Sequence, residues 1–140
     1  MPLLANDTDG AITRKRLESY VAVREKATVV AATDAATVQT AAQLSGAARV
    51  VYTMTPSAAR TLTTPTGAEL GAAFTDEAVG TSFEFTVVNG AAATHAITLT
   101  AGASGVTLGG VAGMATIAAA SSASFVAVFT AANTVTIYRA

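Results

Sequence analysis

Apolar and polar residues alternate with a period of two through much of the chain, which is typical of β-strands with one buried face. The clearest example is the segment 82–88, where Phe83, Phe85 and Val87 share one face. Residues 125–129 are instead apolar on both faces, which predicts a strand in the middle of a sheet or in an interface. Strand signals occur at residues 28–30, 49–54, 61–64, 82–88, 96–100, 106–108, 115–117, 125–129 and 134–139.

Turn residues separate these segments at intervals of about 8–12 residues, which is the spacing of an all-β sandwich or barrel. We count about eight short strands and predict a jelly-roll-like β-sandwich of two packed sheets. One short helix is predicted after Pro65, because Thr66 and Glu69 have the spacing of a capping box. The sequence does not decide the conformation of residues 34–46.

The beginning of the chain differs in charge from the remainder. The chain has 8 basic and 9 acidic residues, and nine of these charges lie in residues 1–26, whereas residues 85–138 contain none. We therefore predict an N-terminal arm over residues 1–26 and a single β-sandwich domain over residues 27–140. The arm is either a frayed terminus or a docking segment.

The composition favours a protein that is permanently packed against other protein molecules. Charged residues make up 12% of the chain, about half the usual share, so Thr, Ser and Ala must cover much of the surface. Such a surface repels neighbouring molecules poorly. The net charge of -1 argues against nucleic acid as a partner. No apolar stretch is long enough for a membrane span, and no signal peptide is expected.

Residue types that carry chemistry are scarce. The chain has no Cys and a single His, His95, which excludes the usual zinc-ligand sets. No G-x-S-x-G nucleophile motif is present, and the glycine-rich turns lack the Lys of a phosphate-binding loop. We therefore predict no catalytic residue, no cofactor, no metal site and no enzymatic activity.

The order of strand and turn types resembles a block common in virion proteins of tailed bacteriophages. The resemblance is carried by residues 61–66, 79–89, 97–102, 117–125 and 129–139. The block is similar to head cement (decoration) proteins and to some head-fibre domains. This resemblance implies a jelly-roll-like fold and a place on the capsid exterior, where the chain would bind the major capsid protein and tie neighbouring capsomers together. It does not extend to the first 50 residues.

Two sets of residues are candidates for these contacts. We expect the basic residues of the arm to contact the capsid: Arg14, Lys15, Arg16 and Arg24. We expect the apolar strand near the C-terminus to supply core together with the self-association face of a homodimer or homotrimer: Phe125, Val126, Val128 and Phe129.

A second function stays open beside the first, namely a carbohydrate- or receptor-binding module of a phage head or tail fibre. Sugar sites present exposed aromatic side chains as platforms. Most of the eight aromatic residues fall at predicted inward positions, and Tyr52 and Tyr138 are the two candidates for exposure.

Overall fold

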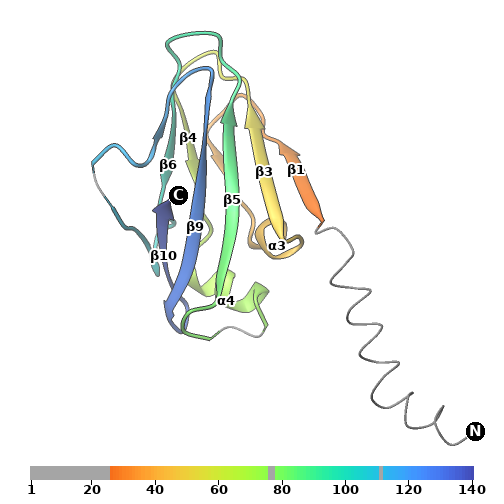
Figure 1. The fold of residues 1–140 in the computed structure, drawn as a ribbon, viewed down its shortest axis with the longest axis vertical. Helices are drawn as coiled ribbons and strands as arrows, with labels where there is room; N and C mark the ends of the chain where they lie inside the picture. Colours follow the sequence, from red (N-terminus) through yellow and green to blue (C-terminus); the bar gives the residue numbers. More distant parts are fainter. Residues whose placement is uncertain (1–25, 76–77, 111) are drawn as a thin grey trace, which may run out of the picture.

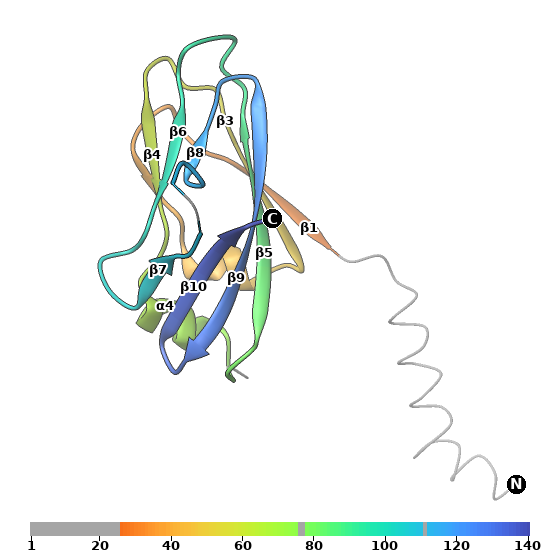
Figure 2. The same ribbon diagram turned by 60° about the vertical axis from the view of Figure 1, so that its left-hand side comes forward.

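The computed structural model describes residues 26–75, 78–110 and 112–140. Two β-sheets pack face to face, and two short helices lie at one end of the pair (Figure 1, Figure 2). The larger sheet has the strand order β1-β3-β5-β9-β10-β7 and the smaller sheet the order β2-β4-β6-β8. The elements are β1 (Ala27–Ala31), β2 (Thr37–Val38), α3 (Ala41–Ser45), β3 (Arg49–Met54), β4 (Arg60–Thr63), α4 (Gly67–Ala73), β5 (Ser82–Asn89), β6 (Ile97–Thr100), β7 (Val106–Leu108), β8 (Thr116–Ile117), β9 (Ser121–Ala131) and β10 (Thr134–Arg139).

The predicted all-β sandwich of two sheets is confirmed, but jelly-roll connectivity is not. A jelly roll is built from antiparallel Greek keys. Here β1, β3 and β5 pair in parallel, and so do β2, β4 and β6. The reason is that the described chain changes sheet after every strand up to β9, and from β1 to β6 each pair of crossings returns it to the same sheet in the same direction. β8 and β9 then run antiparallel to β6 and β5. β9 and β10 form the one hairpin of consecutive strands among the described residues.

The core lies between the sheets and consists of the inward positions of the alternating strands. In β5 these positions are Phe83, Phe85 and Val87, as the sequence predicts, and all three are buried. Phe85 stacks on Phe125 of β9 with 5.3 Å between ring centroids, and Tyr52 of β3 meets the edge of Phe85 at 6.4 Å. Because β-strands alternate strictly, the residues between these inward ones must face the opposite side of the sheet.

The helices close one end of the sandwich, and each begins with the same hydrogen-bonding pattern. At α4, Thr66 Oγ1 accepts from the backbone of Glu69, and the Glu69 carboxylate accepts from the backbone N–H of Thr66. This is the predicted capping box. α3 has a second one, formed by Thr40 and Gln43, in a region that the sequence pattern left open. Each helix buries one leucine against the core, Leu44 from α3 and Leu70 from α4.

Three turns meet beside the start of α4, and glycine is required there. A Cβ on Gly67 would lie 2.0 Å from the carbonyl oxygen of Asn133, which no side chain tolerates. Gly105 has a φ of 69° and faces the same oxygen, at 2.4 Å from a built Cβ. The backbone N–H of Gly67 donates to Ser104, and that of Val135 donates to Gly105. These contacts fasten α4 to the β9–β10 hairpin.

Asn89 ends β5 and joins the two sheets. Its amide nitrogen donates to the carbonyl oxygens of His95 at 2.8 Å and Ile117 at 3.0 Å, while its amide oxygen accepts from Ala91 at 3.0 Å. Asn89-Gly90 therefore starts a crossing between sheets and not a two-residue hairpin. The buried amide is fully used in holding that crossing in place.

Candidate functional site on the outer face of the larger sheet

The larger sheet has one side packed on the core and one side that no described element covers (Figure 2). We call the uncovered side the outer face. Its side chains come from the outward positions of six strands, and all of them are exposed or partly exposed. They are Ala27, Val29, Ala31, Arg49, Val51, Thr53, Ser82, Glu84, Thr86, Val88, Thr107, Ser122, Ser124, Val126, Val128, Thr136 and Tyr138.

The strand register mixes aliphatic, aromatic and hydroxyl side chains across the outer face. Val126 of β9 lies between Glu84 of β5 and Tyr138 of β10, and Val128 lies between Ser82 and Thr136. A second row begins with Val29 and Val51 and continues into hydroxyl side chains. The result is a continuous surface of aliphatic and hydroxyl groups across the sheet.

Hydroxyl side chains of this surface form hydrogen bonds with one another in part. Thr86 Oγ1 and Ser124 Oγ are 2.8 Å apart across β5 and β9. A hydroxyl that is already hydrogen-bonded within its own sheet loses less when a partner displaces water from it. The surface can therefore be covered by another protein at a low desolvation cost.

Two charged side chains belong to the outer face. Arg49 of β3 and Glu84 of β5 are neighbours in the parallel register and have opposite signs. Together with Ala27, Val51 and Ser124 they border a shallow hollow of about 160 Å³. Because their charges offset one another, the face does not repel a partner of either sign.

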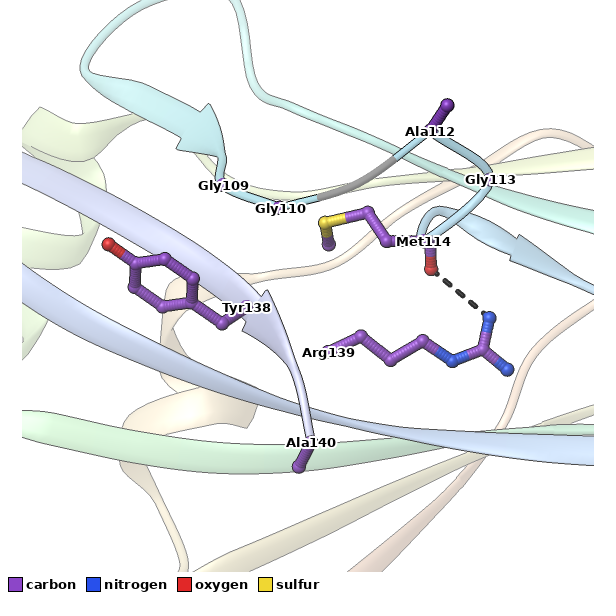
Figure 3. Close-up of a pocket in the computed structure, with 8 residues that line it drawn as sticks. All are labelled: Gly109, Gly110, Ala112, Gly113, Met114, Tyr138, Arg139 and Ala140. Carbon is purple, nitrogen blue, oxygen red and sulfur yellow. Dashed lines mark hydrogen bonds between the residues drawn. The ribbon is translucent and has the colours of Figure 1, made fainter.

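A larger pocket lies where β10 ends (Figure 3). It has a volume of about 610 Å³, and its walls are the loop that contains Gly109, Gly110 and Gly113 together with Met114 and the last residues of β10. Three of its wall residues are glycines, which leave the backbone accessible, and Ala112 and Met114 contribute apolar surface. Tyr138 stands at its border and is 46% exposed.

The two side chains at the end of β10 have different roles, and they point in opposite directions (Figure 3). Arg139 Nη1 donates to the carbonyl oxygens of Met114 at 3.2 Å and Thr116 at 2.8 Å, which ties the pocket wall to β10. The ring of Tyr138 lies over Gly109, where a Cβ would come within 2.6 Å of it. Tyr138 is thus an exposed aromatic ring that packs closely on the backbone of Gly109.

The structure separates the four residues expected in the core and the self-association face. Phe125 and Phe129 have no exposed surface and belong to the core. Val126 and Val128 lie on the outer face, so they alone of the four can contact another molecule. The expected capsid contacts, Arg14, Lys15, Arg16 and Arg24, lie outside the described residues.

The two tyrosines that were candidates for a sugar platform also differ in exposure. Tyr138 is exposed as expected, whereas Tyr52 is 1% exposed and therefore cannot serve as a platform. Its hydroxyl donates to Gln43 Oε1 at 3.2 Å, and burial raises the pKa of Tyr52 to about 12. The sequence carried only a partial signal for this burial, because the opposite face of the strand holds Arg49 and Thr53 but also Val51.

One charged cluster was not anticipated from the sequence. Asp34 Oδ1 accepts from Arg60 Nε at 2.7 Å, and Asp34 Oδ2 accepts from the backbone and the hydroxyl of Ser57. The Arg60 guanidinium, followed by the Ser57 groups, holds the pKa of Asp34 far below its usual value. The cluster joins the loop after β1 to the start of β4, so it fastens the crossing between the sheets.

Neither a metal centre nor a membrane helix emerges from the part of the chain that the structure describes. Within it, no three His, Asp or Glu side chains are grouped closely enough to hold a metal ion. No helix within it has the length and apolar character needed to cross a membrane. His95 lies partly exposed just before β6.

Comparison of the chain with protein-family models, curated proteins and solved structures gave no match.

Proposed function

We propose that this chain is a structural virion protein that binds the outside of an icosahedral phage capsid and cements neighbouring capsomers. The observation that supports this proposal is the outer face, a sheet surface of exposed and partly exposed aliphatic and hydroxyl side chains with one pair of opposite charges. Burying such a surface is favourable because few charged groups lose their water. The proposed partners are the major capsid protein and neighbouring copies of the same chain.

The size of the outer face supports a role on a lattice. Six strands at a spacing of about 4.8 Å, with between six and seven residues each on average at about 3.3 Å, cover roughly 600 Å². A standard interface buries about 800 Å² on each partner. The outer face thus supplies about three quarters of a stable contact, and many copies on one shell compensate through avidity.

We assign the remaining contact to the basic residues of the N-terminal segment, Arg14, Lys15, Arg16 and Arg24. Positive side chains in this segment complement acidic surfaces and are sensitive to ionic strength. Val126 and Val128, near the middle of the outer face, are our candidates for contacts with neighbouring copies. The proposed location is the capsid exterior.

The experiment measures how much protein binds to capsid shells of the phage that encodes the chain. We expect the double variant Val126→Asp with Val128→Asp to lose most of its binding in co-sedimentation, because two charges would then have to be desolvated. The matched control is Thr98→Asp with Thr100→Asp, which places two charges with the same spacing on exposed positions of β6. The proposal would be contradicted if the outer-face variant bound the shells as fully as wild type, or if the wild-type protein did not bind the shells.

A second variant tests the N-terminal contribution in the full chain. Reversing three charges, with Arg14→Glu, Lys15→Glu and Arg16→Glu, should weaken shell binding and reduce its dependence on salt concentration. Unchanged binding at low and high salt would remove this segment from the proposal while leaving the outer face to be judged separately.

Tyr138 and its pocket support a second candidate function, the binding of a carbohydrate or a surface receptor. An exposed aromatic ring beside an open pocket of about 610 Å³ is the kind of platform on which a sugar ring stacks. A glycan array probed with wild-type protein and with Tyr138→Ala distinguishes this function. Hits that disappear in the variant support it, and an array without hits excludes it.

A further inference from the structure

The four sheet edges of this protein are not equally protected. β7, β2 and β8 are edge strands of three, two and two residues. β1 is the longest edge, with five residues, and its sequence Ala-Thr-Val-Val-Ala has no charge, no proline and no glycine. Proteins usually protect an exposed edge by keeping it short or by placing charged residues or proline on it, because an unprotected edge pairs with another strand. Figure 1 shows β1 at the border of the larger sheet.

The backbone hydrogen bonds show which groups of β1 face outward from the sheet. Arg49 N–H donates to the carbonyl of Lys26, and Ala32 N–H donates to the carbonyl of Thr53. Because the backbone alternates along a strand, the even-numbered residues of β1 face β3. The N–H and C=O groups of Ala27, Val29 and Ala31 therefore point away from the sheet, and no hydrogen bond to them occurs among the described residues.

The side chains of the same edge are also exposed. Val29 is 66% exposed, the second-highest value among the large hydrophobic residues of the described chain. Ala27 and Ala31 flank it on the outer face and are exposed as well. The edge thus offers both free backbone groups and apolar side chains, the two requirements for adding a strand.

From this edge we infer that two copies of the chain associate by antiparallel pairing of β1 with β1, centred on Val29. In this register each Val29 exchanges both of its backbone hydrogen bonds with Val29 of the second copy. Each Ala27 does the same with Ala31 of the other chain, so all six outward backbone groups of each strand are satisfied. The two larger sheets then form one continuous sheet, and the two outer faces lie side by side.

A second copy fits this edge better than a foreign peptide, because the strand is complementary to itself. Its outward positions run small, large, small, so that alanine meets alanine and valine meets valine. Lys26 comes to lie opposite Ala32, which keeps like charges apart. A two-fold axis also closes the assembly at two chains, whereas a head-to-tail arrangement would continue into a filament.

The inference does not depend on a role in a virion, since it concerns purified protein in solution. Five residues per strand make a smaller contact than a standard interface, so we expect a dimer that dissociates on dilution. Sedimentation of the full chain over a wide concentration range should show a shift from the 13.9 kDa of one chain to twice that mass. A mass of one chain at every concentration, or of three chains, would overturn the inference.

Charge variants test the register itself. In Val29→Lys two ammonium groups would face each other across the two-fold axis, and in Val29→Glu two carboxylates would, so each variant alone should be monomeric. An equal mixture of the two variants should recover the dimer, which a merely misfolded variant could not do. Val38→Lys, at a comparably exposed position (63%) of edge strand β2, is the matched control and should remain dimeric.

Cross-linking provides a readout that does not require a strong dimer. The chain has no cysteine, so a single introduced thiol reports one position only. Directly opposite residues of a hydrogen-bonded antiparallel pair have Cα atoms about 5.5 Å apart, which a disulfide spans. Val29→Cys should therefore oxidise to a covalent dimer at least about tenfold faster than Val38→Cys, because pairing raises the effective thiol concentration.

The same measurements separate this contact from the outer face. The dimer should persist in Val126→Asp with Val128→Asp, because these residues are remote from β1 in the strand order. Loss of the dimer in that variant together with its survival in Val29→Lys would overturn the inference and assign self-association to the outer face. Equal oxidation rates for the two cysteine variants would also overturn it.

Discussion

The two sides of β9 differ more in their surroundings than in their chemistry. Phe125 and Phe129 point inward and have no exposed surface, whereas Val126 and Val128 alternate with them and lie on the outer face. All four residues are apolar. The inner side contacts a second sheet and the helices, and the outer side has no described element above it. The comparison indicates that stability is concentrated on one side of the strand and that the other side is available for binding.

The largest expected difference is between neighbouring residues of β9. Phe125→Ala should lower the free energy of unfolding by about 3–5 kcal/mol, because it empties a core position that stacks on Phe85. Val126→Ala should lower it by less than about 1 kcal/mol, because its side chain lies on the outer face and is only partly buried. Urea unfolding of both variants measures the difference. Similar losses for the two residues would mean that the outer face is covered after all.

A smaller change in chemistry, from valine to threonine, should show the same asymmetry. Val135 of β10 is fully buried, so Val135→Thr places a hydroxyl in the core and should cost about 1–3 kcal/mol. Val128→Thr on the outer face should change stability by no more than about 0.5 kcal/mol. Thermal unfolding followed by circular dichroism compares the two. A larger loss of stability in Val128→Thr than in Val135→Thr would contradict this prediction.

The helix caps should give an intermediate effect. Thr66→Ala removes the side-chain acceptor for the backbone of Glu69 and should destabilise the protein by about 1 kcal/mol. Thr40→Ala, at the equivalent position of α3, should act in the same direction. Thr98→Ala on the exposed side of β6 is the control and should be nearly neutral. A neutral Thr66→Ala would show that α4 is held by packing alone.

The smallest effect is expected for the exposed cluster of Asp34. Its pKa is held far below the ordinary 3.8, first by Arg60 and then by Ser57. A carboxyl whose pKa is lower in the folded state contributes stability above pH 3.8, and this contribution disappears as the pH falls towards the folded-state pKa. The difference in melting temperature between wild type and Asp34→Asn should therefore be small at pH 7 and shrink below pH 4. A difference that grows in acid would contradict this assignment.

Much of the secondary structure could be predicted, because it depends on neighbours in the chain. The alternation in β5 and β10 and the capping box of α4 are local signals, and each leads to the expected element. The capping box of α3 was an equally local signal, Thr40 followed by Gln43, but it stood in an alanine-rich stretch without clear periodicity. Ser121 and Ser122 lie before the strand expected at residues 125–129 and nevertheless begin β9, since β5 provides a partner for them.

The candidate site was predictable in part. Val126 and Val128 were identified together with two buried phenylalanines, because a segment that is apolar at every position does not reveal which face is inward. Val29 and Val51 were not identified as surface residues, since β-branched residues in a strand are equally suited to a core. The register that places them in one row joins segments more than twenty residues apart, and such pairing leaves no local mark.

The amino-acid sequence by itself determined the all-β character of the chain, the extent of most strands and the sidedness of those that alternate. These features follow from the two-residue period of the extended backbone. The tertiary structure alone decided that successive strands change sheets, that β1, β3 and β5 run parallel, and that no described element covers one face of the larger sheet or the edge at β1. The physical reason is that the choice of pairing partner depends on how distant segments share one core, and hydrogen-bonding groups are identical in every strand.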